Sequence, residues 1–268
     1  MNTVTSKDGT KIAFDKTGSG PAVLLVNGAM QYRATDPSMA KLAELLSKDF
    51  TVYNYDRRGR GESTDTAPFS KEREIEDLAA LVEAAGGSAM VFGISSGGAL
   101  VLDAAQSGLG ISKMALYEVP FIVNDSRPPV PADYVEHLHQ LVKDGKRDEA
   151  VKYFLVKAVG IPAEYLGGMD QDPLWPGMLG IAHTIAYDGA FVADKMQGKA
   201  LPAKYLSGVT VPALVISGTN TMPPGWMISA ADAIAAALPT AERRTLEGQD
   251  HNVDPVVIAP LIAEFFKR

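Results

Sequence analysis

The 268-residue sequence contains no cysteine, which excludes disulfide bonds, a thiolate nucleophile and cysteine-ligated metal within it. It also lacks an apolar run of the ~18 residues that a membrane-spanning helix needs. The first nine residues, Met1 to Gly9, do not contain the apolar core of a signal peptide. From these absences we expect a cytoplasmic protein that does not associate with membranes.

An excess of positive charge is lacking too. The chain has 25 Lys and Arg against 32 Asp and Glu, a formal net charge of −7, whereas nucleic-acid binding calls for clustered cations. The one basic cluster, Arg57-Arg58-Gly59-Arg60, is short and soon followed by Glu62, so we interpret it as a structured turn. No group of His, Asp and Glu has metal-ligand spacing. We therefore expect no nucleic-acid partner, no metal and no cofactor.

Hydrophobic residues make up 46% of the chain, enough for a sizeable core, and they occur in short runs between helical patterns. The order of these elements predicts a mostly parallel sheet with right-handed crossovers. The predicted strands are Thr10–Asp15, Pro21–Val26, Phe50–Tyr55, Ala89–Phe92, Lys113–Tyr117, Pro212–Ser217 and Glu242–Leu246. The predicted helices between them are Pro37–Ser47, Lys71–Ala85, Gly97–Gln106, Ile228–Leu238 and Pro255–Lys267.

The alternation of strands and helices stops between about Phe121 and Ser207, a stretch rich in Pro and Gly. Helical patterns there cover Ala132–Lys143 and Asp148–Val159. This interruption predicts a helical cap at residues 121–207, inserted into a core domain made of residues 1–120 and 208–268.

The segment Gly93-Ile94-Ser95-Ser96-Gly97 matches G-x-S-x-G, directly between a predicted strand and a predicted helix. That context is the one in which the motif forms a nucleophile elbow, a turn so tight that the flanking residues must be small. It predicts Ser95 as a nucleophile, with the N–H of Ser96 at a helix N-terminus. The alternative is a glycine-rich turn in which the serine only caps the helix.

Among the four histidines, His251 follows the last predicted strand and comes after Ser95 in the chain, as a general base in such an arrangement requires. His137 and His139 are two residues apart on a predicted helix and so face different directions, which favours surface positions. His183 lies in the predicted cap, where it either lines a pocket or packs within the cap.

Five segments together resemble the α/β-hydrolase superfamily along nearly the whole chain. They are Val23–Gly28, Tyr55–Ser63, the elbow, Val211–Gly218 and Gly248–His251. The resemblance implies an α/β-hydrolase fold: a mostly parallel eight-stranded sheet flanked by helices, with the cap inserted. It also implies an oxyanion hole built from the N–H groups of Ala29 and Ser96, although Asn27-Gly28 stands where members of the family usually have His-Gly.

A second departure concerns the acid of the triad. Many members of the family carry it after the seventh strand, where this chain has Gly218–Pro224 without a carboxylate. Glu118 follows the strand ending at Tyr117, and this position resembles the one from which some members, including certain haloalkane dehalogenases, take their acid. The predicted triad is therefore Ser95, His251 and Glu118, with Asn220 as a neutral alternative partner for His251.

The predicted function is hydrolysis of a small to medium carboxylic ester, lactone or thioester through an acyl-enzyme, in the manner of a carboxylesterase. C–C bond hydrolysis or perhydrolysis on the same residues, or ligand binding without catalysis, stay open as alternatives. We expect a small-molecule substrate and a monomer or homodimer. The residues predicted to line the substrate pocket are Met30, Phe121, Trp175, His183 and Tyr187.

Overall fold

The computed structural model covers residues 1–268 and contains one eight-stranded sheet. Its strands are β1 (Asn2–Thr5), β2 (Lys11–Thr17), β3 (Ala22–Val26), β4 (Thr51–Tyr55), β5 (Ala89–Ile94), β6 (Ile111–Tyr117), β7 (Ala213–Gly218) and β8 (Ala241–Leu246). The helices of the core are α1 (Pro37–Leu46), α2 (Lys71–Ala84), α3 (Ser96–Gln106), α8 (Trp226–Ala237) and α9 (Pro255–Lys267). Every strand and helix predicted from the sequence is present, with ends that differ by one or two residues.

The strands lie in the order β1-β2-β4-β3-β5-β6-β7-β8, and all pairs from β4 to β8 are parallel. β1 and β2 form an antiparallel hairpin that extends the sheet next to β4. The predicted mostly parallel sheet is thereby confirmed. Because parallel strands point the same way, the loops after β3, β5, β6 and β7 all leave the sheet at one edge.

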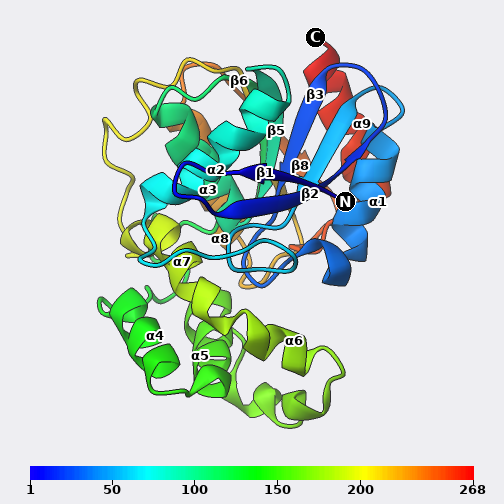
Figure 1. The fold of residues 1–268 in the computed structure, drawn as a ribbon. Helices are drawn as coiled ribbons and strands as arrows, with labels where there is room; N and C mark the ends of the chain where they lie inside the picture. Colours follow the sequence, from blue (N-terminus) through cyan, green and yellow to red (C-terminus); the bar gives the residue numbers. More distant parts are fainter.

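Helices cover both faces of the sheet (Figure 1). α1 and α9 pack together on one face, and α2, α3 and α8 lie on the other. Successive side chains of β5 alternate between the two cores, with Met90 and Phe92 on the side of α1 and α9, and Val91 on the side of α3. Burial on both faces explains why the central strands are continuous apolar runs.

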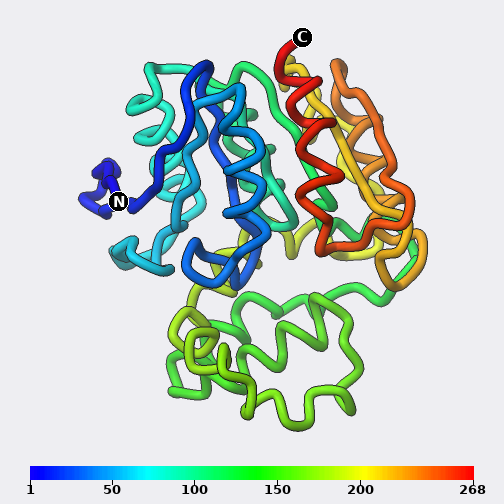
Figure 2. Tube along the Cα trace, turned by 90° about the vertical axis from the view of Figure 1, so that its right-hand side faces the viewer, coloured from blue at the N-terminus to red at the C-terminus, as the bar shows by residue number.

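A group of helices lies below the sheet edge at which these loops emerge, as a separate layer in Figures 1 and 2. We call it the cap. Its α-helices are α4 (Tyr134–Lys143), α5 (Arg147–Phe154), α6 (Trp175–Gly180) and α7 (Ile185–Val192). A π-helical segment, Leu155–Val159, continues α5, and short 3₁₀ turns connect the others. α7 packs against both α3 of the core and α4 of the cap, so it is the helix that joins the two layers.

The two helices predicted for this region correspond to α4 and to α5 with its π-helical extension. α6 and α7 were not predicted because they are short and lack an apolar stripe of helical period. No helix in the structure combines the length and the apolar character needed to cross a membrane.

Candidate active site

Ser95 lies at the turn between β5 and α3, with φ 55° and ψ −132°. Glycine is required around it: a Cβ on Gly97 would lie 2.4 Å from the carbonyl oxygen of Val26, and one on Gly93 2.8 Å from the Cα of Gly98. The Ser95 side chain makes no capping hydrogen bond to α3. Its hydroxyl is therefore not used to satisfy the helix, unlike that of an ordinary capping serine.

Three residues other than glycine have positive φ, and all three lie at the same edge of the sheet. They are Met30 (63°), after β3, Ser95 (55°), after β5, and Glu118 (47°), after β6. Such backbone strain costs about 1–3 kcal/mol per residue and concentrates at functional sites. The concentration of strain after these three strands makes this edge the candidate functional site on grounds independent of residue type.

Glu118 is fully buried and its carboxylate contacts the imidazole of His251. Glu118 Oε2 lies 2.8 Å from His251 Nδ1. The other oxygen, Oε1, accepts hydrogen bonds from the N–H of Gly218 at 2.9 Å and from the Thr221 hydroxyl at 2.7 Å. A carboxylate in this position holds the proton on Nδ1 and leaves Nε2 as the basic nitrogen.

No other polar side chain of the loops after β7 and β8 forms a hydrogen bond with the His251 ring. Asn220, the alternative partner, donates instead to the Gly248 carbonyl at 3.1 Å. The Asp250 carboxylate accepts from the N–H of Asn252 at 2.7 Å, and Asp254 caps α9 through the N–H of Val256 at 2.8 Å. The loop between β7 and α8 thus supplies no partner for His251, and its Thr221 hydroxyl donates to Glu118 instead.

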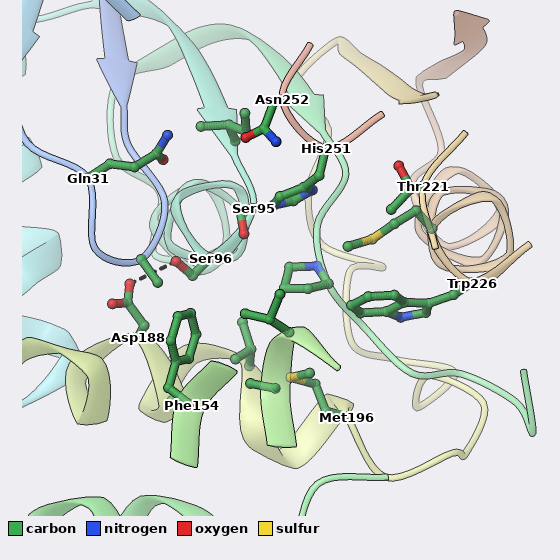
Figure 3. A pocket seen from close by; sticks show the side chains of 18 of the residues that line it. Gln31, Ser95, Ser96, Phe154, Asp188, Met196, Thr221, Trp226, His251 and Asn252 are labelled. Carbon is green, nitrogen blue, oxygen red and sulfur yellow. Dashed lines mark hydrogen bonds between the residues drawn. The ribbon is translucent and has the colours of Figure 1, made fainter. Parts of the chain in front are cut away.

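Ser95 and His251 line one cavity of about 280 Å³ between the sheet edge and the cap. Figure 3 shows the His251 ring beside the Ser95 hydroxyl at the wall of this cavity. No hydrogen bond joins the two side chains in the structure. Catalytic hydrogen bonds of this kind are often long before substrate binds, and they tighten in the complex.

The two N–H groups predicted for the oxyanion hole belong to residues that line the same cavity, Ala29 and Ser96. The N–H of Ala29 donates to no oxygen of the chain. Ser96 is the first residue of α3, where the N–H has no acceptor within the helix and the helix dipole favours negative charge. Gln31 braces the loop after β3 by accepting from the Gly28 N–H at 2.7 Å.

Four of the five residues predicted to line the substrate pocket, Phe121, Trp175, His183 and Tyr187, do not line this cavity, so the prediction was wrong for them. Met30 lines an adjoining cavity of about 220 Å³, and the two cavities share Gln31, Ile94, His251 and Asn252 as lining residues. Phe121 and Trp175 are buried in the apolar core that continues from the sheet into the cap. Large aromatic side chains gain much from burial, so aromatic character alone does not separate a pocket wall from the core of a cap.

His183 and Tyr187 are also outside the cavity, in a contact between cap and core. The Tyr187 hydroxyl donates to Asp65 Oδ2 at 2.8 Å, and His183 Nε2 lies 3.5 Å from the same oxygen. The Tyr187 ring stacks on Phe69, with 3.9 Å between the ring centroids. Although burial alone would raise it, the hydrogen bonds from His183 and Tyr187 hold the pKa of Asp65 below its usual value of 3.8.

The apolar wall of the cavity comes instead from Phe154, Val192 and Met196 of the cap and from Trp226 and Met227 of α8. Asp188 of α7 lines the cavity too, and no sequence pattern predicted this position for it. Its carboxylate is almost fully buried and pairs with Arg57 and Arg60 at 2.5 Å each.

The only signal in the sequence for this pairing was the arginine cluster itself. Arg57, Arg58 and Arg60 lie in the predicted structured turn, and each residue is only 1% exposed. Fully buried guanidinium groups are commonly paired with carboxylates, but nothing in the sequence indicates which of the 32 acidic residues pair with these arginines. No group of three or more His, Asp or Glu side chains in the structure is placed to hold a metal ion.

Comparison with known proteins shows to which family the chain belongs. A sequence model described as "Alpha/beta hydrolase family" matches residues 23–260. The crystal structure of an alpha/beta hydrolase from Sphaerobacter thermophilus DSM 20745 is similar at 49% identity and a TM-score of 0.88, over 99% of this chain and 100% of that one.

Two more distant structures share the fold. A thermophilic esterase from Thermogutta terrifontis is 20% identical, with a TM-score of 0.74 over 99% of this chain and 97% of its own. The enol-lactonase from Burkholderia xenovorans LB400 is 21% identical, with a TM-score of 0.70 over the whole of both chains. No curated protein matches the chain.

Proposed function

Because the chain belongs to the alpha/beta hydrolase family, we propose that it is a serine hydrolase that cleaves carboxylic esters through an acyl-enzyme on Ser95. One observation carries the proposal: the buried Glu118 carboxylate lies 2.8 Å from His251 Nδ1, beside the cavity that Ser95 and His251 share. Esterase and lactonase activities are named for the two more distant structures, which fits this reaction class.

In the proposed mechanism, His251 Nε2 removes the proton of the Ser95 hydroxyl as Oγ attacks the carbonyl carbon of the ester. The N–H groups of Ala29 and Ser96 bind the oxyanion, a contribution of roughly 3 kcal/mol for each donor. Glu118 stabilises the imidazolium and remains ionised. His251 then protonates the departing alcohol, and a water molecule activated by the same nitrogen hydrolyses the acyl-enzyme.

The lining of the cavity supports a neutral, apolar acyl group of small to medium size. No Lys or Arg lines it, and its one carboxylate, Asp188, is already paired with two arginines. A substrate with a free carboxylate would find no cation there, so the lining favours simple esters over anionic substrates of C–C bond hydrolysis. The strained backbone at Ser95 and Glu118 favours catalysis over plain ligand binding.

A fluorophosphonate probe and a series of p-nitrophenyl esters from acetate to decanoate test the proposal. The probe should label Ser95, as located by mass spectrometry, and the protein should hydrolyse the shorter esters. Ser95→Ala should abolish labelling and lower kcat by about 10⁴-fold or more. Ser107→Ala, at the other end of α3, is the matched control and should leave both unchanged. An unlabelled native protein without esterase activity would contradict the proposal.

A further inference from the structure

A buried ionic group connects the cap with both sides of the proposed oxyanion hole. It consists of Arg57 and Arg60, from the loop after β4, and Asp188, from α7 of the cap; we call it the Arg57–Arg60–Asp188 group. Arg57 Nη1 donates to Asp188 Oδ1 and Arg60 Nη2 donates to Asp188 Oδ2, each at 2.5 Å. All three residues are at most 3% exposed, so water screens these contacts little.

Arg60 also forms a hydrogen bond with the peptide unit that carries one of the two proposed oxyanion donors. Its Nη1 donates to the carbonyl oxygen of Gly28 at 2.5 Å. That oxygen and the N–H of Ala29 belong to the same peptide, and in a planar trans peptide they point in opposite directions. A guanidinium that holds the Gly28 oxygen on one side therefore directs the Ala29 N–H to the other side. Arg57 supports the preceding peptide by donating to the Asn27 carbonyl at 3.2 Å.

Asp188 holds the residue that carries the second donor. The Ser96 hydroxyl donates to Asp188 Oδ1 at 2.7 Å, the contact drawn as a dashed line in Figure 3. Ser96 is 3% exposed and follows the nucleophile directly, so this bond anchors the first turn of α3. The group thus touches the peptide of Ala29 through Arg60 and the side chain of Ser96 through Asp188.

The charges within and beside the group balance one another. Asp188 lines the cavity, where an unpaired carboxylate would repel the negative charge that develops on the oxyanion. Pairing with Arg57 and Arg60 neutralises it, and Glu74 balances the remaining positive charge by accepting from Arg57 Nε at 2.6 Å. The four side chains together therefore carry no net charge.

We propose that the Arg57–Arg60–Asp188 group is a positioning device that sets the direction and spacing of the Ala29 and Ser96 N–H donors. The inference rests on the proposed function and deepens it. The cap thereby contributes to the rate of the reaction through α7, in addition to the walls of the cavity. The proposal also gives a role to Arg57 and Arg60 of the arginine cluster and to Ser96, the second serine of the elbow, none of which belongs to the triad.

Arg58 provides a matched control within the same turn. It is as buried as its neighbours, but it pairs with Asp77 at 2.7 Å and with Asp8 at 3.0 Å, near the N-terminal hairpin. None of its hydrogen bonds reaches the loop after β3 or the elbow. Arg58→Lys and Arg60→Lys each keep one buried positive charge and lose a forked set of hydrogen bonds, so they differ chiefly in which contacts are lost.

The experiment compares Arg60→Lys, Ser96→Ala and Arg58→Lys with the native chain. The measurements are the rate constant for fluorophosphonate labelling of Ser95, kcat and KM for a p-nitrophenyl ester, and the melting temperature. A misaligned donor should slow labelling and lower kcat by about 10- to 100-fold in Arg60→Lys and Ser96→Ala, with KM within about twofold. Arg58→Lys should lower the melting temperature about as much as Arg60→Lys and keep kcat within about twofold.

Ser96→Ala guards against a folding defect, because it removes one hydroxyl and leaves every ion pair of the group in place. The inference is overturned if the native protein is labelled and both Arg60→Lys and Ser96→Ala retain its labelling rate and kcat. It is equally overturned if Arg58→Lys lowers kcat as much as Arg60→Lys does. A native protein that the probe does not label removes the proposed function, and this inference with it.

Discussion

The core and the cap contribute to the same cavity in different ways. The core places Ser95 at the end of β5, Glu118 at the end of β6 and the loop with Ala29 and Met30 after β3, with strained backbone at each of the three places. The cap contributes side chains from helices that no strand holds in place, such as Phe154 and Val192. The proposed chemistry thus lies where the backbone is most constrained, whereas helix packing in the cap sets the shape of the cavity.

Asp188 is the exception that makes the comparison useful. It belongs to the cap, yet its bonds reach Ser96 and the two arginines of the core. Helix α7 of the cap is therefore bonded to the part of the core for which we propose catalysis. Substitutions on the two sides of this division should have effects of different kind and size.

The largest effect is expected in the core. Glu118→Gln retains the size of the side chain but removes the charge that stabilises the His251 imidazolium. We expect kcat for an ester to fall by about 10³- to 10⁴-fold with the fold intact. Asn220→Ala is the control, since the Asn220 side chain bonds only the Gly248 carbonyl, and it should keep full activity. Kinetics and melting curves check both variants; a Glu118→Gln enzyme with near-native kcat would remove Glu118 from the triad.

An intermediate effect, on selectivity, is expected from the wall of the cavity in the cap. Val192→Phe places a larger ring in the cavity and should lower kcat/KM for the decanoate relative to the acetate by about tenfold. Trp175→Phe changes a buried residue in the core of the cap that does not line the cavity. It should lower the melting temperature and leave the preference for chain length unaltered. The ratio of kcat/KM values across the ester series measures the difference, and an unchanged ratio in Val192→Phe would show that the acyl group binds elsewhere.

The smallest effect is expected at the contact between cap and core. Tyr187→Phe keeps the ring stacked on Phe69 and removes the hydrogen bond to Asp65. A loss of about 0.5–1.5 kcal/mol, or about 1–5 °C in melting temperature, should follow, with kcat and KM unchanged.

This contact should also depend on pH. The pKa of Asp65 is lowered in the folded state, so its stabilisation is present above the usual value of 3.8 and is lost as the pH falls through the lower, folded value. The difference in melting temperature between the native chain and Tyr187→Phe should therefore shrink below pH 3.8. A change in kcat at neutral pH would instead place Tyr187 in the substrate pocket.

Much of the fold followed from local patterns. Apolar runs such as Ala22–Val26 lie within strands buried on both faces, and Ser95 lies at a turn that is tight enough to require the glycines around it. The position of Glu118, directly after β6, was also readable, because the ends of parallel strands meet at one edge. The pocket was not readable, since Phe121 and Trp175 carry the same apolar signal as true wall residues such as Trp226.

By itself, the sequence determined the order of strands and helices, the sharp turn at Ser95 and the loop that carries His251. These depend on interactions between residues close together in the chain: apolar period, small residues at a tight turn, and the end of a strand. Only the tertiary structure decided which face of the cap borders the cavity and which carboxylate neutralises Arg57 and Arg60. Asp188 lies 131 positions from Arg57 in the chain, and no local pattern encodes a contact that arises when two separate layers pack.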